Sequence, residues 1–157
     1  MRRPSPTTLA TSTAVVATAV VGTAGTDVTS RWYRELDKPP WQPPGPVFGI
    51  AWSGLYVLLA TAGARALGSA GPRERRSYGR AYAANLVLNA GWTWAFFRLR
   101  RPPLATAEAL VLAASTADLA RRSGRLDPAA GRLLVPYAAW TAFAAALSAE
   151  IARRARG

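Results

Sequence analysis

Long stretches without charge divide this sequence, and short runs of arginine separate them. Residues 4 to 26 hold no charged side chain, and the later stretches are 39 to 64, 81 to 97, 102 to 117 (apart from Glu108) and 133 to 149. A helix of roughly 20 residues crosses a hydrocarbon core about 30 Å thick. Each stretch comes close to that length, so the pattern predicts five membrane-spanning helices.

The predicted fold class is all-α, a single domain over residues 1–157 that forms an integral membrane bundle of five transmembrane helices. The helices are expected at about 8–26, 46–67, 80–98, 103–120 and 129–152. Residues 27–45 form a loop rich in proline and tryptophan. Pro136 falls inside the last predicted helix and should bend it or free a carbonyl, because proline cannot donate a backbone hydrogen bond. The first stretch also suits a signal peptide, since Arg2 and Arg3 precede an alanine-rich run, but the later stretches would still span the membrane.

The charge balance is strongly basic, with 20 Lys and Arg against 8 Asp and Glu. Such a balance occurs in nucleic-acid-binding proteins. Here the arginines lie at the ends of the uncharged stretches, as in loops that face anionic headgroups, so we expect a lipid bilayer as partner and no nucleic acid. The two predicted sides carry 11 and 9 basic residues, which is too even to fix the orientation. One lysine against nineteen arginines, with abundant alanine, suggests a GC-rich bacterial genome and favours a multi-pass protein of a bacterial cell membrane.

Several reactive residue types are missing from the chain. The sequence contains no cysteine and no histidine, which excludes disulfides, Cys/His metal sites and a Ser-His-Asp triad. Any general acid or base must be Asp, Glu, Tyr, Lys or Arg. We therefore predict no metal site and no required cofactor, and the sequence holds no conventional catalytic constellation.

Three predicted helices each carry a stripe of aromatic and polar residues at helical spacing. The stripes are Phe48, Trp52 and Tyr56; Asn85, Asn89, Trp92 and Phe96; and Tyr137, Trp140, Ala144 and Ser148. Amide side chains are costly in hydrocarbon, so Asn85 and Asn89 should face the bundle interior or a cavity. The stripes then converge on a ligand pocket. The simpler alternative is that both asparagines only hold helices together and the aromatics only pack.

Two further features have ordinary explanations. Trp32, Tyr78 and Trp94 lie near predicted helix ends, where aromatic side chains often form belts at the membrane interface. Glu108 lies near the start of a predicted helix, where a carboxylate is favourable. It could instead couple protons to a small transporter, although a single carboxylate is thin support for that function.

Four ordered motifs now identify a family resemblance. They are WYRELDKPPWQPP from residue 32, FGIAWSGLY from 48, NLVLNAGWTWAFF from 85 and LLVPYAAWTAFAAALS from 133. Together they resemble the TspO/MBR family, which comprises the tryptophan-rich sensory proteins and the mitochondrial translocator protein, also called the peripheral-type benzodiazepine receptor. The resemblance covers nearly the whole chain. It implies a five-helix bundle, a homodimer, and a pocket under the first loop that binds porphyrins and hydrophobic drug-like molecules.

The resemblance also implies a set of ligand-binding residues. Carried over by motif, they are Tyr33, Trp41, Pro44, Phe48, Trp52, Tyr56, Asn85, Asn89, Trp92, Phe96, Tyr137, Trp140 and Ala144. Trp41 is expected to cap the pocket. Trp52 and Trp140 match a pair that is linked, in some bacterial members, to light- and oxygen-dependent porphyrin breakdown, and would be the catalytic residues of such an enzyme.

The chain departs from the family pattern at two points. Many members end the last motif with leucine-asparagine, where this chain has Leu147 and Ser148. No tyrosine follows Tyr137, so the sterol motif of animal members is missing and we expect no sterol recognition.

A porphyrin also suits the residue chemistry. Indoles stack on its flat macrocycle, and its propionates could meet Arg31, Arg34 or Lys38 in the loop. Without histidine or cysteine, iron ligation would be weak, so metal-free protoporphyrin IX should bind at least as well as haem. The sequence therefore predicts a membrane-embedded tetrapyrrole-binding protein with a sensory, regulatory or porphyrin-handling role. The alternatives are a photo-oxidative porphyrin-degrading enzyme and a small transporter.

Overall fold

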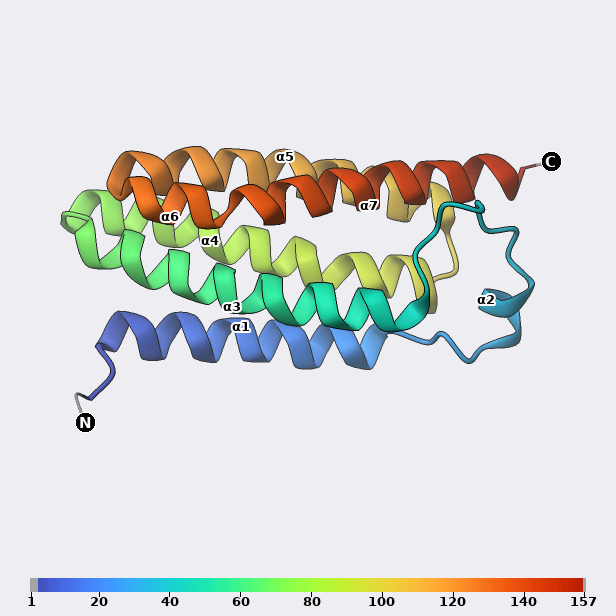
Figure 1. The fold of residues 1–157 in the computed structure, drawn as a ribbon, viewed down its shortest axis with the longest axis horizontal. Helices are drawn as coiled ribbons and strands as arrows, with labels where there is room; N and C mark the ends of the chain where they lie inside the picture. The colour runs from blue at the N-terminus through green and yellow to red at the C-terminus, as the bar shows by residue number, and fades with distance from the viewer. Residues whose placement is uncertain (1–2, 157) are drawn as a thin grey trace.

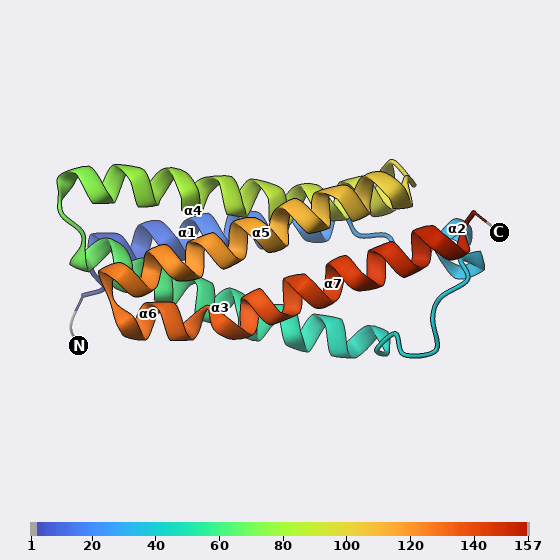
Figure 2. The same cartoon turned by 90° about the horizontal axis from the view of Figure 1, so that it is seen from above.

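The computed structural model describes residues 3–156, which form a bundle of five long helices (Figures 1 and 2). The long helices are α1 (Pro6–Gly25), α3 (Gly45–Ser69), α4 (Pro72–Thr93), α5 (Pro102–Leu126) and α7 (Val135–Arg154). The short elements are α2 (Arg31–Glu35), the π-helix η1 (Trp94–Arg98) and α6 (Pro128–Leu133). No strand occurs within residues 3–156. The all-α bundle is confirmed.

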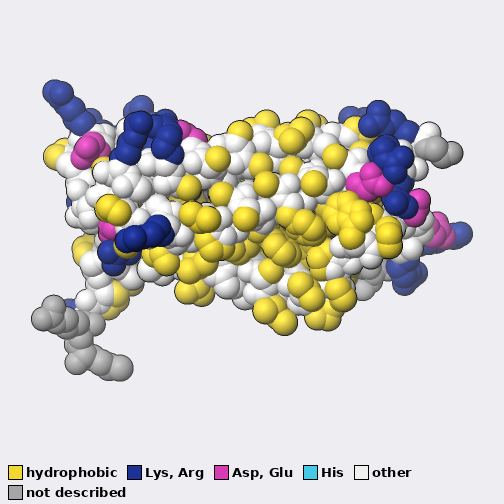
Figure 3. All heavy atoms as spheres, turned by 45° about the horizontal axis from the view of Figure 1, so that its top comes forward, with side chains coloured by type: hydrophobic (Ala, Val, Ile, Leu, Met, Phe, Trp, Pro, Cys, Tyr) yellow, Lys and Arg dark blue, Asp and Glu magenta, His cyan; other side chains and the backbone are white. Residues whose placement is uncertain are grey.

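The surface is divided as a membrane requires. Side chains of Lys and Arg gather at both ends of the bundle, and a hydrophobic zone lies between them (Figure 3). Within the described residues, three segments are long and apolar enough to span a membrane by length and composition: Pro6–Gly25, Gly45–Ser69 and Pro128–Arg154. Helices α4 and α5 are also long enough, but arginines occupy the first turns of α4 and the last turns of α5.

The arginine-rich ends explain two wrong boundaries. Helix α4 begins at Pro72 and not near 80, and α5 runs to Leu126 and not to 120. Uncharged stretches indicate where hydrocarbon is crossed, whereas arginine is a good helix former and extends its charge into the interface. Both helices therefore continue beyond the apolar zone.

Pro136 has a larger effect than the expected bend. The predicted helix 129–152 is two helices, because α6 ends at Leu133 and α7 begins at Val135. Proline has no N–H to bond the carbonyl of the preceding turn, and it is well tolerated only in a first helical turn. A new helix accordingly begins at Val135, which places Pro136 in the first turn of α7.

Asp127 fixes the join between α5 and α6. Its carboxylate accepts the backbone N–H groups of Ala129 at 2.8 Å and Ala130 at 3.4 Å, and it pairs with Arg65 of α3 at 2.9 Å. Burial raises the pKa of Asp127, but the bonds to Arg65 and to the two amides outweigh it and hold that pKa below its ordinary value. The carboxylate therefore contributes stability at neutral pH, and that contribution is lost as the pH falls through the lowered pKa.

The predicted belt of interfacial aromatics is only partly present. Tyr78 is 2 % exposed and its hydroxyl bonds Ser123 of α5 at 2.8 Å, so its assignment to the belt is wrong. The early start of α4 makes Tyr78 a core residue of that helix. Trp32 is half-buried, with its ring edge-on to Phe96 at 5.6 Å, and only Trp94 is exposed.

Candidate functional site

A cavity of about 410 Å³ lies between α1, α3, α4 and α7, at the end of the bundle that the 27–45 loop covers. The structure brings seven of the predicted ligand-binding residues into its wall: Tyr33, Phe48, Trp52, Tyr56, Asn89, Trp92 and Phe96. The loop, helix α3 and helix α4 therefore do converge on one hollow.

Six predicted residues lie outside the cavity wall: Trp41, Pro44, Asn85, Tyr137, Trp140 and Ala144. Trp41 is 48 % exposed and packs edge-on against Phe143, with ring centroids 5.9 Å apart, so it does not cap this cavity. Asn85 and Tyr137 are fully buried in the bundle behind it. Trp140 stands behind Trp52, at 6.4 Å between ring centroids. The cavity therefore reaches only part of each predicted helical stripe.

Helix α1 supplies a wall that the sequence reasoning missed. Its lining residues are Ala19, Gly22, Thr23 and Thr26. They follow the spacing i, i+3, i+4, i+7, which places them on one helical face. That face of small residues was a usable signal, but nothing in it resembles a binding motif. The loop and α7 add further lining residues that the family motifs did not supply: Val28, Gln42, Leu147, Ser148 and Ile151. Of these, Ser148 lies on the stripe predicted for the last helix.

The π-helix η1 explains how neighbouring aromatics reach the same cavity. The N–H of Leu99 donates to the carbonyl of Trp94 at 2.9 Å, a bond across five residues. Such a widened turn changes the direction of the following side chains and is frequent at functional sites. Phe96 and Phe97, adjacent in sequence, are both buried and both line the cavity. Trp92 stacks on Phe96 with ring centroids 5.8 Å apart.

The loop over the cavity is held by its own contacts. Ser30 caps α2, and Gln42 Nε2 donates to the hydroxyl of Tyr33 at 3.3 Å. Lys38 Nζ donates to the carbonyls of Tyr33 and Leu36, and lies 4.5 Å from the centre of the Tyr33 ring. Burial lowers the pKa of Lys38 below its ordinary value. Lys38 therefore ties the loop back to the end of α2.

Only one of the three loop cations proposed for propionates lacks a partner within residues 3–156. Arg31 pairs with Glu35 at 2.6 Å, and Lys38 is held by carbonyl oxygens. Arg34 is exposed and forms no ion pair among the described residues. Arg34 is thus the loop cation most accessible to an anionic group.

A chain of buried hydrogen bonds lies behind the cavity. The Tyr56 hydroxyl donates to Asn89 Oδ1 at 3.0 Å, and Asn89 Nδ2 donates to the Tyr137 hydroxyl at 3.0 Å. That hydroxyl donates to Asn85 Oδ1 at 2.8 Å, and Asn85 Nδ2 donates to Thr116 at 3.0 Å. The chain joins α3, α4, α7 and α5. Asn85 holds helices together, whereas Asn89 does so and also lines the cavity.

Replacing Tyr137 with phenylalanine should destabilise the bundle by about 1–2 kcal/mol, because it leaves two buried atoms, Asn85 Oδ1 and Asn89 Nδ2, without their hydrogen-bond partner. The measurement is the free energy of unfolding in detergent. Tyr33→Phe is the control, since its hydroxyl bonds only Gln42 in a half-buried loop. Equal stability of the two variants would show that the buried hydrogen bonds of Tyr137 contribute no more to the free energy of unfolding than the loop hydrogen bond of Tyr33.

Glu108 and Trp140 bear on the alternative functions. Glu108 is half-buried beside Gly91, where an added Cβ would collide with its carboxylate, and it does not line the cavity. Its protonation is therefore not coupled to the cavity by any direct contact. Trp140 Nε1 is buried and bonds no group within residues 3–156. Those residues also hold no group of three acidic side chains that could bind a metal ion.

Comparison with known proteins agrees with the four motifs. The model of the TspO/MBR family matches residues 10–154. A tryptophan-rich sensory protein from Cereibacter sphaeroides is 37% identical over 122 residues, which is 78% of this chain and 75% of that protein. The tryptophan-rich protein TspO of Chlorobaculum tepidum is 32% identical over 136 residues, covering 83% and 86%. The translocator protein of Ovis aries is 35% identical over 121 residues, covering 75% and 71%.

Proposed function

The chain belongs to the TspO/MBR family, and from this premise we propose that its cavity binds a tetrapyrrole, with protoporphyrin IX as the best candidate. The protein is a multi-pass membrane protein whose relatives carry the names of sensory and translocator proteins. Ligand binding would serve such a sensory or translocator role.

The observation that carries the proposal is the composition of the cavity wall. Seven aromatic side chains line it, and none of its described lining residues is charged. Aromatic rings favour a ligand with a broad π surface. The volume of about 410 Å³ falls within the usual range of small-molecule sites, about 300–1,000 Å³. A porphyrin ring suits this wall better than a charged metabolite does.

The charged groups of a porphyrin must then stay at the mouth of the cavity. Burying a carboxylate in a wall without cations is unfavourable. Arg34 follows Tyr33, which lines the cavity, and is available for a propionate. Because the sequence has no histidine or cysteine, a central iron would find neither of these axial ligands. Metal-free protoporphyrin IX should therefore bind at least as well as haem.

A titration with protoporphyrin IX, followed by tryptophan quenching, tests the proposal. Trp52→Phe should weaken binding by about threefold to tenfold, because it removes indole surface from the wall. Trp94→Phe is the matched control, since Trp94 is exposed and does not line the cavity. Trp41→Phe should also bind like the unmodified protein, since Trp41 packs against Phe143 and does not line the cavity. If Trp52→Phe and Trp94→Phe bind equally well, the ligand does not occupy this cavity.

A second candidate function is photo-oxidative breakdown of the bound porphyrin. Trp52 lines the cavity, and Trp140 lies edge-on behind it, with ring centroids 6.4 Å apart at 86°. The two indoles form a short path for an electron to leave or reach the ligand. Illumination of the complex with and without oxygen tests this candidate. A bleaching rate equal to that of porphyrin in empty detergent would exclude it.

The homodimer implied by the family resemblance is also part of the proposal. Val16 and Val20 of α1 and Ile50 of α3 are exposed apolar side chains that a second copy or lipid must cover. The mass of the protein in detergent, measured by sedimentation, distinguishes a dimer from a monomer.

A further inference from the structure

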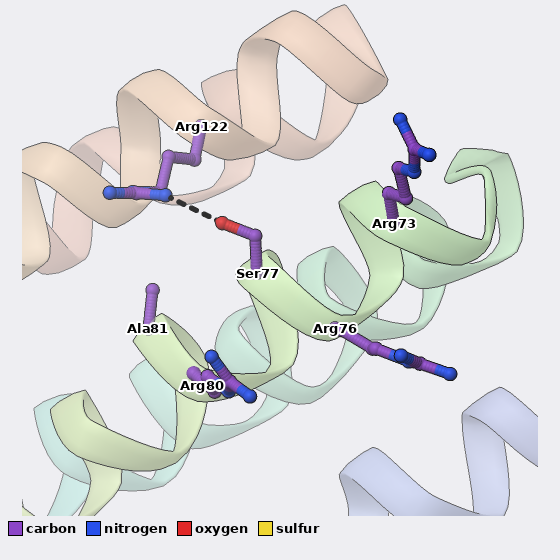
Figure 4. A pocket seen from close by; sticks show the side chains of 6 residues that line it. All are labelled: Arg73, Arg76, Ser77, Arg80, Ala81 and Arg122. Carbon is purple, nitrogen blue, oxygen red and sulfur yellow. Dashed lines mark hydrogen bonds between the residues drawn. The ribbon is translucent and has the colours of Figure 1, made fainter.

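A second hollow lies at the opposite end of the bundle, far from the covered cavity. It is an open groove of about 590 Å³ between α4 and α5. Four arginines line it together with Ser77 and Ala81: Arg73, Arg76 and Arg80 from α4, and Arg122 from α5 (Figure 4). We propose that this groove binds the phosphate headgroup of an anionic phospholipid.

The groove follows directly from the spacing of residues on α4. Positions 73, 76, 77, 80 and 81 recur at three- and four-residue intervals and so share one helical face. Helix α5 runs alongside α4 and brings Arg122 to the same place, where its Nη1 donates to the Ser77 hydroxyl at 3.3 Å (Figure 4). That hydroxyl keeps its own hydrogen for a ligand.

Three of the four arginines have no counter-charge within residues 3–156. The nearby acidic groups are already engaged: Asp118 pairs with Arg121 and Arg122, and Asp127 pairs with Arg65. Glu74 accepts the backbone N–H of Gly71 at 2.9 Å and so caps α4. Arg73, Arg76 and Arg80 form no ion pair with any described acidic residue. Like charges at these spacings destabilise a helix, which an anion in the groove would relieve.

The position of the groove points to a lipid as the source of that anion. Arg73 and Arg80 are separated by about 10 Å along the helix, at 1.5 Å per residue. That distance covers the headgroup layer on one side of a bilayer, which is roughly 5–8 Å thick. Arg73, Arg76 and Arg80 lie in the first turns of α4, directly before its uncharged stretch 81–97. Lys and Arg side chains gather at both ends of the bundle, on either side of a hydrophobic zone (Figure 3). Small, apolar Ala81, on the next turn toward the hydrocarbon, leaves room for the glycerol and the first acyl carbons.

The chemistry of the lining matches a phosphodiester. Guanidinium groups bind phosphate oxygens through paired, charge-assisted hydrogen bonds. Basic pockets between transmembrane helices bind anionic headgroups, and acyl chains in the bilayer hold the phosphate in place. A free phosphate would find the same donors without that anchorage.

The test measures the Kd of a fluorescent phosphatidylglycerol for the full chain in mixed micelles of neutral detergent. The groove variant is Arg73→Gln/Arg76→Gln/Arg80→Gln. The matched control is Arg75→Gln/Arg125→Gln/Arg132→Gln, which removes the same charge from exposed positions at the same end but outside the groove. We expect the groove variant to bind at least about tenfold more weakly, equivalent to one lost charge-assisted hydrogen bond. The control should lose less than about threefold, because exposed charges outside the groove act on a single lipid only through screening solvent.

Equal losses in the two variants would overturn the proposal, since they would mean unspecific attraction to the basic end. Inorganic phosphate serves as competitor in a parallel arm. Displacement of the labelled lipid by phosphate at equal concentration would show that the groove takes a free anion and not a lipid. Unfolding temperatures in phosphatidylcholine alone check the fold of both variants. Should the triple variant not fold, Arg76→Gln against Arg75→Gln repeats the comparison with one charge each.

Discussion

Replacing Gly22 with leucine should weaken protoporphyrin IX binding by at least about a hundredfold, which corresponds to about 2.7 kcal/mol. Gly22 lies on α1 in the wall of the covered cavity. A Cβ added there would meet only Tyr56 at 3.8 Å and Thr93 at 3.9 Å, both ordinary contacts. The first carbon therefore fits, and the rest of the leucine side chain must extend into the space that the ligand needs. The measurement is the Kd from tryptophan quenching.

Two controls isolate this effect. Gly22→Ala adds only the carbon that fits, so its Kd should change by less than about threefold. Gly54→Leu adds the same side chain to α3 at an exposed position outside the cavity, where nothing lies within 4 Å of the added Cβ. Both should bind like the unmodified protein. Unchanged binding by Gly22→Leu, with a normal unfolding temperature, would mean that the ligand lies elsewhere.

The asparagine stripe of α4 shows how far the sequence could predict the site. The cost of amides in hydrocarbon correctly placed Asn85 and Asn89 inside the bundle, at 0 % and 4 % exposed. One turn of helix then separates a residue that only joins helices from one that also lines the cavity. Asn89 lines the cavity and Asn85 does not, and Asn85 instead bonds Tyr137 of α7 and Thr116 of α5. That boundary depends on the packing of several helices, and no single stripe contains it.

Helix α1 shows the opposite case. Its contribution to the cavity consists of small residues, so its role is to leave space. Sequence motifs consist of side chains that contact a ligand or another residue, and small residues leave no such signal. A stretch of alanine, glycine and threonine in a membrane helix is common for packing reasons alone. Ser148 is intermediate. It was visible as a departure from the family pattern, and the structure places it in the cavity wall as the acceptor of the Trp92 Nε1–H at 3.2 Å.

The second large effect is expected at the crossing of α5 and α6. A Cβ added to Gly131 would lie 2.6 Å from the Cα and 2.9 Å from the backbone nitrogen of Gly124. Backbone atoms cannot rotate away as a side chain can, so Gly131→Ala must push the helices apart. Overpacking costs about 1–3 kcal/mol, and a backbone clash belongs at the upper end. Alanine regains about 1 kcal/mol as a better helix former. We therefore expect a net loss of about 2 kcal/mol in the free energy of unfolding in detergent.

The same contact supplies its own control, because it is asymmetric. A Cβ added to Gly124 would lie 3.6 Å from the Cα of Gly131, an ordinary contact. Gly124→Ala should therefore keep the helical gain without the clash, and increase stability by up to about 1 kcal/mol. The same glycine-to-alanine change should therefore lower the free energy of unfolding at position 131 and raise it at position 124. If both variants lose stability equally, general loosening of the α5–α6 turn and not the direction of the Cβ decides the outcome. The position of α6 matters for the site because it sets where α7 begins at Val135, and α7 carries both Tyr137 and Ser148. Gly131→Ala should accordingly weaken porphyrin binding as well, whereas Gly124→Ala should not.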